Sequence, residues 1–105
     1  MVKPSDFRAI VRRGRRTASA SMLVYRVERD PDAPARFGFI VAKTVGNAVE
    51  RNLVRRRMRA VCRTIVDGGG SGSDVVVRAL PGSAQRDWTS LSAEMHAILD
   101  PALTR

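Results

Sequence analysis

The first apolar positions of the chain recur with the spacing of a helix. Three of them share one helical face at positions i, i+3 and i+4: Phe7, Ile10 and Val11. Ser5 or Asp6 can cap such a helix, and Gly14 is a natural C-terminal stop. The pattern therefore predicts a helix from Asp6 to about Arg13.

Alternating apolar positions further along the chain predict strands. After a polar stretch of small residues, segment 22–29 divides its side chains between two faces, Leu23, Tyr25 and Val27 against Met22, Val24 and Arg26. Segment 36–43 follows a turn and is apolar on both faces, which predicts a central strand. Gly38 in that strand would let another backbone or a ligand approach closely. Segment 74–80 predicts a third strand.

Two more helices complete the predicted fold. Asn47 followed by Glu50 is a capping pattern, so we predict a helix from Ala48 to about Val66. A final helix after the turn at residue 81 has an apolar face made by Trp88, Leu91, Met95, Ile98 and Leu99. These elements predict an α+β fold in a single domain over residues 1–105. The pattern locates three strands, and we expect a small sheet of about four strands packed against helices, in the order αβββαβα.

The charge of the chain indicates an anionic partner. The 105 residues carry 19 lysines and arginines against 10 acids, a net charge of +9, and 17 of the cations are arginine. Arginine binds phosphate through two parallel hydrogen bonds and stacks on bases. A small domain this basic points first to nucleic acid and second to an anionic membrane surface.

Other features of composition narrow the compartment and the chemistry. No apolar run approaches the roughly 20 residues of a membrane span, and the N-terminus lacks the apolar core of a signal peptide. The single cysteine, Cys62, excludes an internal disulfide and a cysteine-rich metal site. We therefore expect a cytoplasmic protein with no membrane partner and no metal site of its own.

The predicted helix after Asn47 carries two different faces. At about 100° per residue, one face collects the apolar side chains Val54, Met58, Val61, Cys62 and Ile65. An adjoining stripe, here called the arginine stripe, collects Arg51, Asn52, Arg55, Arg56, Arg59 and Arg63, while Arg57 lies apart. Like charges four residues apart destabilise an isolated helix by roughly 0.2–0.5 kcal/mol per pair. A bound polyanion would relieve this repulsion, which favours a phosphate-binding face over an ordinary solvated surface.

The run 41–63, VAKTVGNAVERNLVRRRMRAVCR, resembles the signature of the bacterial ribonuclease P protein subunit. That family has a strand ending near a lysine, a Gly-Asn-Ala-Val turn and a helix with Arg-Asn-x-x-x-Arg-x-x-x-Arg. The same spacing occurs here at Gly46, Asn47, Ala48, Val49, Arg51, Asn52, Arg55, Arg56 and Arg59. The resemblance covers nearly the whole chain. It departs from the family where Thr44 and Leu53 replace basic residues and where Val11 replaces an aromatic residue.

The resemblance implies a noncatalytic subunit of a ribonucleoprotein that removes the 5′ leader from precursor tRNA. The catalytic RNA would perform the chemistry with Mg²⁺, and the protein, a monomer in the holoenzyme, would bind that RNA and precursor tRNA. The leader would lie in a cleft between the first helix, the second helix and a sheet face, lined by Phe7, Val11 and Tyr25. The implied RNA-binding residues are Arg12, Arg13, Lys43, Arg51, Asn52, Arg55, Arg56 and Arg59. The family also implies a left-handed crossover through the arginine-rich helix.

Alternatives remain open at this stage. The main alternative is a ribosomal or other structural RNA-binding protein. A protein-only nuclease is disfavoured because the chain lacks an arrangement of acid, base and metal-binding residues. Phe7 and Tyr25 could serve the core instead of a cleft. We predict core positions for Phe37, Phe39 and Trp88, and a surface position for the single histidine, His96.

Overall fold

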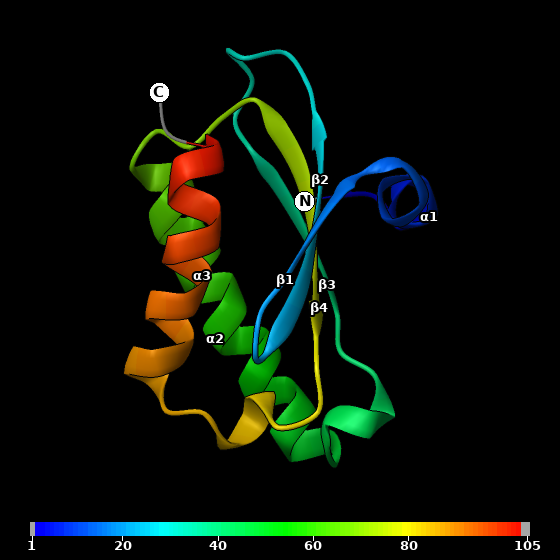
Figure 1. The fold of residues 1–105 in the computed structure, drawn as a ribbon, viewed down its shortest axis with the longest axis vertical. Coiled ribbons are helices and arrows are strands. Elements are labelled where there is room, and N and C mark those ends of the chain that lie inside the picture. The colour runs from blue at the N-terminus through cyan, green and yellow to red at the C-terminus, as the bar shows by residue number, and fades with distance from the viewer. Residues whose placement is uncertain (1, 104–105) are drawn as a thin grey trace.

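The computed structural model describes residues 2–103 and has the α+β architecture expected from the sequence. Within these residues, three helices and four strands follow one another, with two short 3₁₀ turns between them (Figure 1). Their bounds are α1 Pro4–Arg13, β1 Arg15–Ala18, β2 Met22–Glu28, β3 Arg36–Ile40, η1 Lys43–Val45, α2 Ala48–Asp67, β4 Ser73–Ala79, η2 Ser83–Gln85 and α3 Trp88–Leu103. The element order αβββαβα is confirmed.

The four strands form one mixed sheet in the order β1-β2-β4-β3. β4 pairs antiparallel with β2 and parallel with β3, and α2 connects the two parallel strands. The prediction that β3 is central is therefore wrong, because β3 lies at an edge and β4 occupies the centre. β3 is apolar on both faces because helices cover both sides of the sheet (Figure 1). The handedness of the β3–α2–β4 crossover stays a prediction.

The sheet separates two apolar clusters. Figure 1 shows α2 and α3 on one face and α1 on the other. The larger cluster lies between the sheet and the two helices α2 and α3, and it includes the buried side chains Met58, Val77 and Leu91. The smaller cluster lies under α1 and includes Ile10 and Tyr25. Alternate residues of β2 divide between these clusters as the sequence predicts.

The start of α1 differs from the prediction. The helix begins at Pro4, and Lys3 is its N-cap residue without a side-chain cap, so capping by Ser5 or Asp6 is wrong. Proline suits the first turn because its fixed φ is helical and its missing N–H needs no partner there. The predicted stop at Gly14 is confirmed, and its N–H donates to the carbonyl of Ile10 at 2.7 Å.

β1 is the strand that the hydrophobic pattern does not locate. All four of its residues are exposed, so no alternation of burial marks it in the sequence. It pairs antiparallel with β2, and the turn between them is fixed from α3 by Glu94. The Glu94 carboxylate accepts hydrogen bonds from the Ser19 hydroxyl and from the Ser21 N–H, and it pairs with Arg86 at 2.9 Å.

α2 agrees with its prediction at both ends and along its core face. Asn47 accepts a hydrogen bond from the Glu50 N–H at 2.9 Å, and Glu50 accepts one from the Asn47 N–H at 3.0 Å, which is a complete capping box. All five predicted core residues, Val54, Met58, Val61, Cys62 and Ile65, are buried. The helix ends at Asp67, one residue past the predicted end.

α3 carries one prediction that the structure overturns. Leu91, Met95 and Leu99 are buried as expected, but Trp88 is 44% exposed and is not a core anchor. Trp88 shares the helical angle of the core face, yet it is the first residue of α3 and lies one turn before the buried part. The core prediction is confirmed for Phe37, which is buried, and Phe39 packs partly buried against the same cluster.

Candidate RNA-binding surfaces

One candidate surface lies where α1 covers the sheet. The three predicted leader-cleft residues, Phe7, Val11 and Tyr25, belong to a single cluster there, together with the partly buried Leu23 and Ile40. We call these five residues the apolar platform. Tyr25 is only 7% exposed, whereas Phe7 and Val11 are partly exposed. The structure therefore brings the three predicted residues together, with Tyr25 mainly buried as support.

Gly38 explains how α1 lies so close to the sheet. A β-carbon built on Gly38 would lie 2.4 Å from Cζ of the Phe7 ring, well inside van der Waals contact. The sequence predicts a close approach at this glycine, and the approaching group is an aromatic side chain. Because Gly38 has no side chain, the ring of Phe7 can pack closely against β3 on the α1 side of the sheet.

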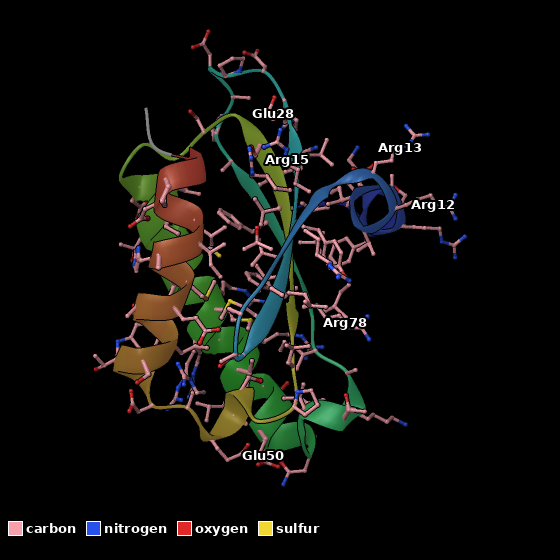
Figure 2. All side chains as sticks on the ribbon, in the orientation of Figure 1. Arg12, Arg13, Arg15, Glu28, Glu50 and Arg78 are labelled. Carbon is pink, nitrogen blue, oxygen red and sulfur yellow. The ribbon has the colours of Figure 1, made fainter. Side chains whose placement is uncertain are left out.

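Arg78 is a basic residue of this face that the sequence analysis does not single out. It is the one exposed residue in β4, and its strand partners Leu23 and Ile40 are platform residues. Figure 2 shows it on the same side of the sheet as α1. No hydrogen bond or ion pair holds its guanidinium within residues 2–103. An arginine breaking a run of valines in a predicted strand is the signal that could have identified it.

Two further arginines extend the charge of this side of the molecule. Arg12 and Arg13 lie in the last turn of α1, both are exposed, and Figure 2 shows them directed away from the sheet. Neither makes a hydrogen bond or ion pair with the described part of the chain. Their charges suit the helix C-terminus, and their guanidinium groups are available to a ligand.

The two helices expected to form the walls of the leader cleft lie on opposite faces of the sheet. α1 contacts the face of the sheet with the platform, whereas α2 packs on the opposite face. The prediction of one cleft between both helices is therefore wrong. The reason is the connectivity: the chain passes from β3 through η1 around the end of the sheet before α2 begins.

The second candidate surface is the arginine stripe of α2. Within residues 2–103, Arg55, Arg56, Arg59 and Arg63 make no hydrogen bond or ion pair. Arg51 donates to the carbonyl of Gly46 at 3.2 Å, so it also holds the turn before the helix. Asn52 is exposed, and Lys43 is exposed on η1. The stripe is thus a row of cations with little local neutralisation.

Other arginines are engaged in the fold. Asp74 on β4 is buried and accepts two hydrogen bonds from Arg36 on β3, at 2.8 and 2.6 Å, and one from Arg29 at 3.1 Å. The hydrogen bonds from the Arg36 guanidinium hold the pKa of the Asp74 carboxyl below its usual value. Arg57 donates to the carbonyl of Arg86 at 2.8 Å. These arginines stabilise the structure and are not counted among the free cations.

Comparison with known proteins identifies the family to which the chain belongs. The ribonuclease P family model matches residues 1–103. The chain is 46% identical over 99 residues to the ribonuclease P protein component of Clavibacter michiganensis subsp. michiganensis, across 94% of this chain and 88% of that protein. It is 43% identical over 101 residues to that of Arthrobacter sp. strain FB24, across 96% and 74%. The chain belongs to the ribonuclease P protein family.

Solved structures of ribonuclease P proteins have the same fold. The Staphylococcus aureus protein superposes with a TM-score of 0.84 at 24% identity, covering 97% of this chain and 93% of that one. The Thermotoga maritima protein gives a TM-score of 0.80 at 22% identity, covering 91% and 90%. The chain thus has the fold of these ribonuclease P proteins.

The remaining titratable groups can be located in the part of the chain that the structure describes. No three histidine, cysteine, aspartate or glutamate side chains there lie together as metal ligands would. His96 is partly exposed and interacts with Asp100 one turn along α3, at 3.1 Å. Burial raises the pKa of the Cys62 thiol to about 12, so it stays protonated. No helix in residues 2–103 is long and apolar enough to cross a bilayer.

Proposed function

We propose that this chain binds RNA on two surfaces and supports the removal of the 5′ leader from precursor tRNA without doing chemistry itself. The observation that carries the proposal is the arginine stripe, in which Arg55, Arg56, Arg59 and Arg63 make no hydrogen bond or ion pair within residues 2–103. The helix that carries them has a complete capping box at its N-terminus. Folding alone disfavours such a row of like charges, because each pair four residues apart repels. The catalytic RNA would cleave the phosphodiester bond with Mg²⁺, in the cytoplasm.

The leader of precursor tRNA is assigned to the apolar platform. Single-stranded RNA is usually held by stacking on aromatic and apolar side chains beside cations. Phe7 and Val11 supply the accessible apolar surface, and Tyr25 supports it from below. Arg78, Arg12 and Arg13 supply free guanidinium groups for the backbone phosphates on the same side.

The catalytic RNA is assigned to α2. Arg55, Arg56 and Arg59 would bind its phosphates, with Lys43, Arg51 and Asn52 at the start of the helix. A well-anchored helix suits this task because its capping box and buried face hold the backbone positions of these arginines at fixed spacing before RNA arrives. One protein molecule per holoenzyme satisfies this arrangement, since both surfaces belong to one chain.

Reconstitution of the enzyme tests this function. Precursor tRNA is incubated with a bacterial ribonuclease P RNA at low Mg²⁺, with and without this protein. We expect the protein to stimulate release of the 5′ leader and to cleave nothing in the absence of the RNA subunit. Failure to stimulate would contradict the proposal and favour a structural RNA-binding protein. Cleavage by the protein alone would contradict its noncatalytic role.

A further inference from the structure

A groove runs between the edge strand β3 and the C-terminal half of α2. Its volume is about 470 Å³, within the range of roughly 300–1,000 Å³ that ligand pockets occupy. Its accessible apolar wall includes Phe39 and Val66, both partly buried. The groove lies on the α2 side of the sheet, away from the apolar platform under α1.

The rim of the groove is cationic. Arg59 and Arg63, one helical turn apart on α2, are exposed and make no hydrogen bond or ion pair within residues 2–103. Arg36 also lines the groove, but Asp74 already holds its guanidinium. The lining contains one acid, Asp67, at the last position of α2. Two free guanidinium groups beside an aromatic ring form a site suited to a phosphate and a base.

We propose that this groove receives one unpaired nucleotide of the ribonuclease P RNA subunit, with its base against Phe39 and its phosphates on Arg59 and Arg63. The inference rests on the proposed function and adds a site at the C-terminal end of the arginine stripe. An unpaired nucleotide fits because a base inside an RNA helix cannot turn its face toward a protein side chain. The RNA subunit is the chosen source because the groove continues the stripe assigned to it, whereas the leader is assigned to the opposite face.

Two substitutions test the energetics of the site. Arg63→Ala removes one phosphate contact, and we expect it to weaken binding of the RNA subunit about fivefold at about 0.1 M salt. The reason is that each phosphate contact on a single strand makes the binding constant vary with about the −0.7 power of the salt concentration. Phe39→Leu removes the stacking ring and should weaken binding by about fivefold or more. Arg16→Ala changes an exposed, unpaired arginine of β1 and serves as the charge-matched control. Equal binding by the Arg63→Ala and Arg16→Ala proteins would overturn the proposal.

A photocrosslink locates the nucleotide. A thiol introduced by Asp67→Cys at the groove carries a benzophenone maleimide, while the buried, protonated Cys62 stays unlabelled. In the assembled holoenzyme with precursor tRNA bound, we expect a crosslink to an unpaired nucleotide of the RNA subunit, and we expect Arg63→Ala to reduce its yield. The same probe at Ala97→Cys, an exposed position of α3, should give background only. A crosslink to precursor tRNA, a crosslink to a paired segment, or none above background would each overturn the inference.

Activity separates failure of this site from failure of the function. The labelled holoenzyme is assayed for stimulated leader removal in the same samples. Stimulation without a groove crosslink would remove the groove site and leave the proposed function intact. Loss of stimulation by the unsubstituted, unlabelled protein would instead contradict the function on which the site rests.

Discussion

At the scale of single residues, the absence of a side chain at Gly38 determines where the apolar platform forms. Gly38 leaves the space that the Phe7 ring occupies, so two residues far apart in the sequence depend on each other. The sequence identifies the glycine as a site of close approach but not its partner, because spacing along the chain carries no distance through space. Trp88 shows the same limit from the other side, since its helical angle suits the core while its place at the helix end leaves it exposed.

This contact predicts a coupled pair of substitutions. We expect Gly38→Ala to lower the free energy of unfolding by about 1–3 kcal/mol, because the new methyl group would overlap the Phe7 ring. In a Phe7→Ala background the same change should cost less than about 1 kcal/mol, since the ring is gone. Urea denaturation of the four proteins measures this cycle. Equal costs in both backgrounds would contradict the packing described for α1.

At the scale of elements, α2 could be predicted well because its signals are local. The capping box, the buried face and the arginine stripe all follow from residues within one helix. The sheet order could not be predicted, because pairing joins distant segments and β1 has no buried residue to mark it. The two-sided apolar pattern of β3 indicates coverage by helices on both faces, which an edge strand can also have.

The stripe predicts opposite effects on folding and binding. Arg55→Ala removes two like-charge pairs, with Arg51 and Arg59, so it should leave the free protein unchanged or more stable by up to about 1 kcal/mol at low salt. It should also weaken binding of the RNA subunit and reduce the salt slope of log K by about one unit. Thermal unfolding and binding titrations across salt concentrations measure the two effects. An unchanged salt slope would show that Arg55 does not bind RNA phosphate and is an ordinary solvated side chain.

At the scale of the whole molecule, one sheet separates the two surfaces that we propose bind RNA. The platform with Arg78 lies on the α1 face, and the arginine stripe belongs to the helix that covers the other face. We propose that the two surfaces hold different RNAs, the leader on the first and the catalytic RNA on the second. Composition predicts a basic RNA-binding protein, but only the fold shows that its cations lie on separate faces.

Affinity for precursor tRNAs that differ only in leader length tests that claim most directly. Holoenzymes are assembled with saturating protein carrying either no change or Arg78→Ala, which alters an exposed residue that makes no hydrogen bond or ion pair within residues 2–103. Arg78→Ala should weaken binding of a long-leader substrate about fivefold at about 0.1 M salt and leave a substrate with a one-nucleotide leader unaffected. Equal losses for both substrates, or no loss for either, would contradict the assignment of the leader to the α1 face.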